Sequence, residues 1–168
     1  TALQRIELPD SIVEISGYAF SYCASLSEII VPGSVKKIGP SAFIHCKLLE
    51  EIILPKTVGQ EAFYGCTGLK RVSFNPEMTE IAKETFARCT SLIDVVIPDA
   101  VTEIRESAFS GCTSLRSVTL PIGLTMIGKS AFSDCVALES IIIPDTVKAI
   151  EDNAFKDCTS LTEVAMPD

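Results

Sequence analysis

The sequence predicts a β-rich repeat solenoid, in which successive coils of the chain stack on one another. Seven of the eight phenylalanines recur at intervals of 23 residues, except for one interval of 20. A cysteine follows each of these seven phenylalanines by three residues, and a leucine follows each cysteine by another three. Fixed internal spacing of this kind is the signature of repeat architectures, because each repeat buries its apolar face against its neighbours.

The phenylalanine and cysteine positions define seven copies of one unit. The phenylalanines are Phe20, Phe43, Phe63, Phe86, Phe109, Phe132 and Phe155. The cysteines are Cys23, Cys46, Cys66, Cys89, Cys112, Cys135 and Cys158. We therefore interpret residues 1–168 as a single domain of about seven 23-residue repeats, one of them shortened to 20.

Each element of the unit can be assigned from the consensus L-x-x-I-x-I-P-x-x-V-x-x-I-x-x-x-A-F-x-x-C-x-x. The I-x-I part has the alternation of a strand with one buried face, as in Val95 and Ile97. The proline that follows in most copies ends the strand, because it has no N–H for the hydrogen-bonded ladder. The V-x-x-I part, such as Val101 and Ile104, predicts a second, shorter extended segment. The A-F-x-x-C part predicts a tight helical turn.

Two copies depart from this consensus. Only eight steps separate Pro55 from Phe63, against eleven in the neighbouring repeats. We expect Val58 to serve both apolar positions of the V-x-x-I part there, with a local contraction or bend of that side. In the next copy Asn75 replaces the proline that ends the strand, and Pro76 comes one position later.

The ends of the chain lie inside strand segments, near Leu3 and Met166, with no polar capping repeat. Solenoids need such caps for solubility. We therefore expect a fragment of a longer array, or a chain that associates end to end.

The repeat resembles the BspA-type (Treponema pallidum-type) leucine-rich repeat, whose unit reads L-x-x-I-x-I-P-x-S-V-x-x-I-G-x-x-A-F-x-x-C. The stretch from Ile143 to Cys158 follows this unit closely, and the resemblance covers the whole chain. It implies a right-handed solenoid with a parallel sheet of about eight short strands on the concave side. Short helical turns and short extended segments would form the convex side.

The resemblance also implies an extracellular or cell-surface protein with a role in adhesion and protein binding, and it implies no catalytic residues. Residues 1–5 lack the charged start and apolar stretch of a signal peptide, so this location rests on the resemblance. Unpaired cysteines by themselves would favour reducing surroundings.

Composition excludes several classes of partner. Fourteen Lys and Arg residues against 22 Asp and Glu give a net charge of −8, which repels nucleic-acid phosphates and anionic membrane surfaces. No apolar run approaches the roughly 18 residues needed to cross a bilayer, so no membrane insertion is expected.

The residues that most often carry chemistry have simpler interpretations here. The cysteines share one inward position, which predicts a column of free thiols that act as small apolar groups, in preference to disulfides or a metal site. The single histidine, His45, is expected to be exposed and chemically idle because no second base accompanies it. The aspartates after the prolines are expected to form turns and not to bind calcium: Asp10, Asp99, Asp145 and Asp168. We expect no cofactor and no enzymatic activity.

The concave sheet carries the candidate binding residues. Its outward side chains form two columns, which give the candidate surface Glu28, Ile30, Glu51, Ile53, Arg71, Ser73, Asp94, Val96, Ser117, Thr119, Ser140 and Ile142. In the first column we expect Arg5 to pair with Glu28, and Arg71 to lie between Glu51 and Asp94. The second column is an apolar stripe, which indicates an interface, although strand propensity alone could produce it.

The sequence thus predicts a non-enzymatic interaction or adhesion module that binds a protein or a surface glycan on its concave sheet. The alternative is a structural spacer or stalk that holds other domains at a cell surface. Substitution of a concave residue such as Ile53 would leave a spacer intact.

Overall fold

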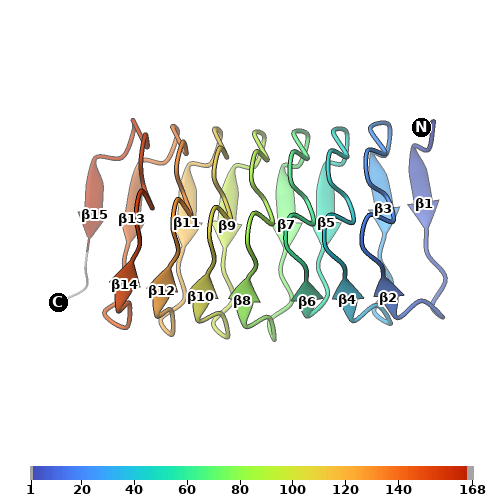
Figure 1. Ribbon diagram of the computed structural model, residues 1–168, viewed down its shortest axis with the longest axis horizontal. Helices are drawn as coiled ribbons and strands as arrows, with labels where there is room; N and C mark the ends of the chain where they lie inside the picture. Colours follow the sequence, from blue (N-terminus) through green and yellow to red (C-terminus); the bar gives the residue numbers. More distant parts are fainter. Residues whose placement is uncertain (1, 166–168) are drawn as a thin grey trace.

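A computed structural model describes residues 2–165 as a parallel β-solenoid of stacked coils. Two rows of short strands run along it, and the first and last strands of the described chain lie at opposite ends of the stack (Figure 1). The first row, here called the main sheet, contains β1 (Arg5–Glu7), β3 (Glu28–Ile30), β5 (Glu51–Ile53), β7 (Arg71–Ser73), β9 (Asp94–Val96), β11 (Ser117–Thr119), β13 (Ser140–Ile142) and β15 (Glu163–Ala165). The second row, the second sheet, contains β2 (Glu14–Ile15), β4 (Lys37–Ile38), β6 (Thr57–Val58), β8 (Glu80–Ile81), β10 (Glu103–Ile104), β12 (Met126–Ile127) and β14 (Ala149–Ile150). Met166, near which the chain was expected to close, lies outside the described residues.

The main sheet has the eight parallel strands that the repeat predicts. They pair as four two-stranded ladders, β1–β3, β5–β7, β9–β11 and β13–β15. The register places equivalent residues of neighbouring repeats side by side, as in Glu51 beside Arg71 and Ile53 beside Ser73. Within each two-stranded ladder, neighbouring members of the two predicted outward columns therefore lie side by side, as predicted.

The second sheet is divided at the shortened repeat. It forms one ladder of β2, β4 and β6, and another of β8, β10, β12 and β14. Val58 lies beside Ile38 in the first ladder, so it occupies the second apolar position of the V-x-x-I part. The expectation that Val58 serves both positions is therefore wrong. Only Lys56 and Thr57 separate Pro55 from Val58. The residue at the first apolar position is therefore one of the three that the third repeat lacks.

The expectation of helical turns around the phenylalanines is also wrong, since residues 2–165 contain no helix. Consecutive N–H groups there bond alternately within their own coil and to the next one. The N–H of Ser110 donates to Ser107 O at 3.1 Å, whereas the N–H groups of Phe109 and Gly111 donate to Ala131 O and Ser133 O, both at 2.8 Å. This alternation replaces the continuous ladder of a helix with a bridge between coils.

The same turns contain two residues per repeat in the left-handed region of backbone space. They lie two positions before and two positions after the phenylalanine, as Ser107 (φ 53°) and Gly111 (φ 72°) do in the fifth repeat. Twelve of these fourteen positions hold residues other than glycine. Left-handed backbone is unusual outside Gly, Asn and Asp, so the stacked architecture imposes this conformation.

The core is a set of continuous columns along the solenoid axis. The seven repeat phenylalanines stack nearly parallel, with ring centroids 5.2–5.7 Å apart. Five of them, from Phe43 to Phe132, are fully buried. Aromatic burial of this extent dominates core energetics, and each of these five inner rings connects its coil to both neighbouring coils.

The cysteines form a second column that is more than a set of small apolar groups. Each thiol from the second repeat onward donates a hydrogen bond to the phenylalanine carbonyl of the preceding coil, at 3.0–3.3 Å between Sγ and O. All seven cysteines are free thiols, as predicted. The column therefore adds a directional contact between coils to the apolar burial.

Candidate functional site

All twelve residues predicted to form the binding surface are exposed on the outward side of the main sheet. In the six strands that carry these residues, β3 to β13 of the main sheet, the central residue faces the core and its two neighbours face solvent. In β5, for example, Ile52 is 3% exposed and Ile53 is 69% exposed. The period of two in the sequence is thus sufficient to place the whole set on one face.

The apolar stripe of the second column proves to be discontinuous. Ile30 and Ile53 lie in successive coils, whereas Ser73 and Thr119 flank Val96 and leave it isolated. Ile142 has Ala165 as its ladder partner. Two exposed isoleucines in succession therefore occur only at the N-terminal end of the candidate surface.

A groove of about 300 Å³ lies at this pair of isoleucines. It brings together half of the predicted residues, while the other six lie further along the main sheet. Its lining is Glu28, Ile29, Ile30, Val31, Glu51, Ile52, Ile53, Arg71 and Ser73. We call it the sheet groove.

The first outward column of the main sheet places charged side chains along the sheet groove. The expected pair of Arg5 and Glu28 is present, with Nε and Oε2 3.4 Å apart. Arg71 bonds Glu51 at 2.6 Å, and the hydrogen bond and charge of Glu51 raise the pKa of the Arg71 guanidinium. Asp94, which was also expected beside Arg71, accepts a 2.6 Å hydrogen bond from the Ser117 hydroxyl. Exposed pairs like these fix side-chain orientation more than they stabilise the fold.

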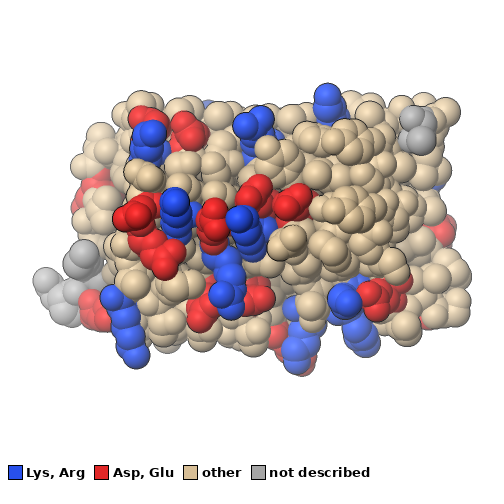
Figure 2. All heavy atoms as spheres, in the orientation of Figure 1, with Lys and Arg blue, Asp and Glu red and all other residues tan. Residues whose placement is uncertain are grey.

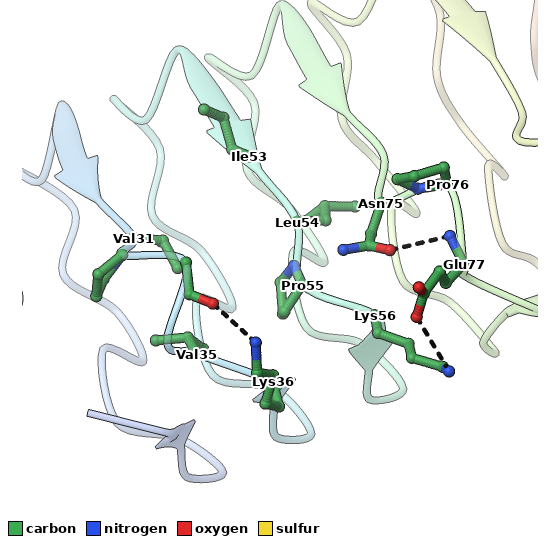
Figure 3. Close-up of a pocket in the computed structure, with 12 residues that line it drawn as sticks. Val31, Val35, Lys36, Ile53, Leu54, Pro55, Lys56, Asn75, Pro76 and Glu77 are labelled. Atoms are coloured by element: carbon green, nitrogen blue, oxygen red, sulfur yellow. Dashed lines mark hydrogen bonds and ion pairs between the residues drawn. The ribbon is translucent and has the colours of Figure 1, made fainter. Parts of the chain in front are cut away.

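A second cavity, of about 450 Å³, lies at the corner between the main sheet and the second sheet (Figure 3). The sequence interpretation missed it, although it noted the shortened repeat that creates it. Its lining is Val31, Pro32, Gly33, Val35, Lys36, Ile53, Leu54, Pro55, Lys56, Asn75, Pro76 and Glu77. We call it the corner pocket. It shares Val31 and Ile53 with the sheet groove, so the two cavities adjoin.

An aromatic cluster lies on the turns beside the phenylalanine column. The His45 ring lies 5.0 Å from Tyr22 and 5.5 Å from Tyr64, between ring centroids, and the Arg88 guanidinium lies 5.8 Å from the Tyr64 centroid. His45 is therefore half-buried among aromatic rings, and not freely exposed as the sequence suggested. Its role here is packing.

Charges are unevenly distributed over the side of the molecule seen in Figure 2. Acidic and basic side chains alternate over its C-terminal half, and much of its N-terminal half is uncharged. Arg105 bridges Glu80 and Glu103 at 2.8 and 2.9 Å, and Lys83 bonds Glu106 at 3.1 Å. These pairs neutralise one another across successive coils of the second sheet.

The buried thiols are poor nucleophiles. Burial raises the pKa of Cys46 and of Cys112 to about 12 and raises the pKa of Cys66 and Cys89 as well. Nucleophilic reactivity of cysteine requires the thiolate. Among residues 2–165 there is no group of three or more His, Cys, Asp and Glu side chains placed to hold a metal ion. Over the same range no helix has the length and apolar character to span a membrane.

Stacked coils, uniform inner positions and an exposed strand face define a solenoid of the leucine-rich-repeat class, which commonly uses its extended sheet face for protein interaction. The chain belongs to the BspA type leucine rich repeat family. Six copies of that repeat region match it, over residues 1–112 and 79–168. The resemblance seen in the sequence is thereby confirmed.

Solved structures support the same assignment. The leucine-rich repeat protein of T. pallidum is 32% identical, with a TM-score of 0.89 over 96% of this chain and 79% of that chain. A leucine-rich repeat protein from Eubacterium ventriosum is 31% identical, with a TM-score of 0.85 over 92% of this chain and 42% of that one. A Bacteroides ovatus protein of 24% identity, with a TM-score of 0.73 over 98% of this chain and 61% of that chain, shares the fold. A comparison with curated proteins gives no match.

Proposed function

We propose that the chain is a non-enzymatic interaction module that binds a partner protein on its main sheet, with a role in adhesion at a cell surface. The observation that carries this proposal is the pair Ile30 and Ile53, which are 40% and 69% exposed at the sheet groove. Exposed apolar side chains beside a concavity, with polar residues at the rim, have the anatomy of a protein interface.

Three further features support this function. The groove has charged pairs at one edge, Arg5–Glu28 and Arg71–Glu51, which would set the orientation of a partner. The buried thiols and the half-buried His45 offer no activated nucleophile or base. Membership of the BspA-type family supports a location outside the cell or on its surface.

The test compares two Ile→Asp variants in the same chain. Ile53 lies at the sheet groove, whereas Ile122 is 80% exposed in the turn after β11, outside the groove. We expect Ile53→Asp to reduce binding at least tenfold on a panel of purified extracellular proteins and receptor ectodomains, and Ile122→Asp to leave it unchanged. A glycan array probed in parallel would detect a carbohydrate partner instead.

The structural spacer is the competing function. A spacer presents no preferred face, so both variants would retain full activity in a cell-adhesion assay and wild type would bind none of the panel. That result would overturn the proposal. Protease treatment of intact cells, followed by detection of the chain, tests the surface location separately.

A further inference from the structure

The corner pocket arises from the three residues that the third repeat lacks. In the repeats on either side, a buried residue fills the first apolar position after the strand: Val35 is 4% exposed and Met78 is 3% exposed. The third repeat passes directly from Pro55 to β6, which begins at Thr57. The corners of the second and fourth repeats are thus left with a cavity between them.

The floor of this pocket is apolar. Leu54 is 3% exposed, Pro55 is buried, and Val35 completes the floor from the preceding repeat. Concave sites that bind small groups are mostly apolar, with a few polar groups that fix orientation. A volume of about 450 Å³ is large enough for one aliphatic residue.

The rim of the pocket carries hydrogen-bond donors and a net positive charge. Lys56 pairs with Glu77 at 3.3 Å, whereas Lys36 Nζ donates to the Gly33 carbonyl at 2.9 Å and has no carboxylate within 4.0 Å among the described residues. Asn75 Oδ1 accepts the Glu77 N–H at 2.9 Å, and its amide nitrogen points the other way, toward Pro55 (Figure 3). Two ammonium groups and one carboxylate leave one positive charge, in a chain whose net charge is −8.

We propose that the corner pocket binds the C-terminal residue of a partner polypeptide, with an aliphatic side chain on the Leu54 and Pro55 floor and the terminal carboxylate beside Lys36 and the Asn75 amide. A chain end carries its carboxylate and its side chain on the same Cα, so both fit within one cavity of this size. Capture of a terminal carboxylate is a recurring mode of peptide recognition. This inference rests on the proposed function, because the rest of the partner would continue along the adjoining sheet groove.

The test uses three synthetic peptides and NMR titration of the isotopically labelled chain. The first is acetyl-Ser-Ser-Gly-Leu with a free carboxylate, the second is the same peptide as its amide, and the third is acetyl-Ser-Leu-Asp-Ser amide. We expect the free acid to shift the backbone amides of the non-proline residues in 31–36, 53–56 and 75–77, with an affinity at least tenfold higher than that of either amide. Equal binding of the first two peptides, or tighter binding of the third, would overturn the proposal, and so would the absence of shifts at the pocket.

Substitutions of two adjacent lysines provide a matched control. Lys36 lines the pocket, whereas Lys37 lies in β4 and pairs with Glu14 at 2.9 Å. We expect Lys36→Met to weaken the free-acid peptide about tenfold and Lys37→Met to leave its affinity unchanged. Equal effects of the two substitutions would indicate general electrostatic attraction and would overturn the proposed site.

Restoring the missing residues gives an independent test. Insertion of Asp-Ala-Val after Pro55 reproduces the eleven steps from Pro to Phe of the other repeats and keeps Val58 at its position beside Ile38. We expect the insertion to close the pocket and abolish peptide binding while the chain melts no lower than wild type. Peptide binding that survives the insertion contradicts the site. If peptide binding fails at the pocket while Ile53-dependent binding to a partner protein is intact, the proposed function still holds. The pocket proposal and the proposed function can therefore fail separately.

Discussion

The thiol of Cys112 donates a hydrogen bond to the carbonyl oxygen of Phe86 in the preceding coil, with Sγ and O 3.2 Å apart. The same oxygen accepts the N–H of Cys89 at 3.1 Å. One carbonyl thus joins two coils, and the bond requires a protonated thiol. Burial keeps the thiol protonated by raising the pKa of Cys112 from 9.0 to about 12.

This raised pKa predicts a loss of stability at alkaline pH. The unfolded chain loses the Cys112 proton near pH 9, whereas the folded chain keeps it to about 12, so the unfolded state binds fewer protons between these values and stability falls as the pH rises. Each such thiol contributes a slope of about 1.4 kcal/mol per pH unit. Urea unfolding of wild type and Cys112→Ala at pH 7, 9 and 10.5 measures it. The variant should show a shallower decline, and parallel declines would contradict the assignment.

Protection of the thiols predicts a specific labelling pattern. Native chain at pH 8 should react slowly with iodoacetamide at Cys66, Cys89 and Cys112, which are fully buried and form little thiolate. After denaturation without reductant, mass spectrometry should show seven labels, one for each cysteine. Fewer than seven labels would demonstrate disulfides.

The phenylalanine column predicts a position-dependent loss of stability. Phe109 is fully buried and stacks on both Phe86 and Phe132, each 5.4 Å away between centroids. Phe109→Ala should reduce the free energy of unfolding by about 3–5 kcal/mol, because it removes a large buried ring. Phe155 is only half-buried and stacks on Phe132 among the described rings, so Phe155→Ala should cost less. Equal midpoints of urea unfolding for the two variants would contradict the column.

The core positions could be predicted from the sequence because their spacing leaves one solution. A repeat that places Phe109, Cys112 and Leu115 at the same intervals as its neighbours buries all of them only when coils stack in register. The outward columns follow from the same register, since strand side chains alternate between faces. Periodicity therefore determined both the core and the candidate surface of the main sheet.

The backbone of the turns could not be predicted in this way. The position two residues after each phenylalanine is left-handed, but it holds Tyr22, His45 and Arg88 as well as glycine and aspartate. Only Gly65 and Gly111, with Asp134 and Asp157, carried a signal for it. The corner pocket was missed for a different reason: the length of the third repeat was visible, but only the pairing of Val58 with Ile38 shows which position was lost.

Alanine substitution at two glycines in equivalent turn positions is expected to reduce stability by different amounts. Gly65 and Gly111 both have left-handed backbone, with φ of 67° and 72°. A Cβ at Gly111 would make ordinary contacts of 3.5 Å or more with Arg88, whereas a Cβ at Gly65 would collide with the His45 ring. We expect Gly111→Ala to cost about 1 kcal/mol, from backbone strain alone, and Gly65→Ala to cost more.

The double variant Gly65→Ala with His45→Ala isolates the contribution of the ring. If the collision with His45 is the cause, the two substitutions are non-additive, and the double variant is more stable than the sum of the single effects predicts. Additive effects in urea unfolding would place the extra cost elsewhere in the turn.

The coils approach each other closely on the second-sheet side. We therefore expect alanine substitution to reduce stability much more at one glycine of the second repeat than at another. Gly39 donates its N–H to Ile15 O at 2.7 Å, and a Cβ there would lie 2.5 Å from the backbone nitrogen of Gly17. Backbone atoms held by the stack cannot move aside, so Gly39→Ala should reduce stability by about 1–3 kcal/mol through overpacking. A Cβ at Gly33 would have no neighbour within 4 Å, and Gly33→Ala should change stability by no more than about 0.5 kcal/mol. Thermal melting of both variants measures the difference, and a Gly39→Ala chain that melts with wild type would show that neighbouring coils can separate at this face without loss of stability.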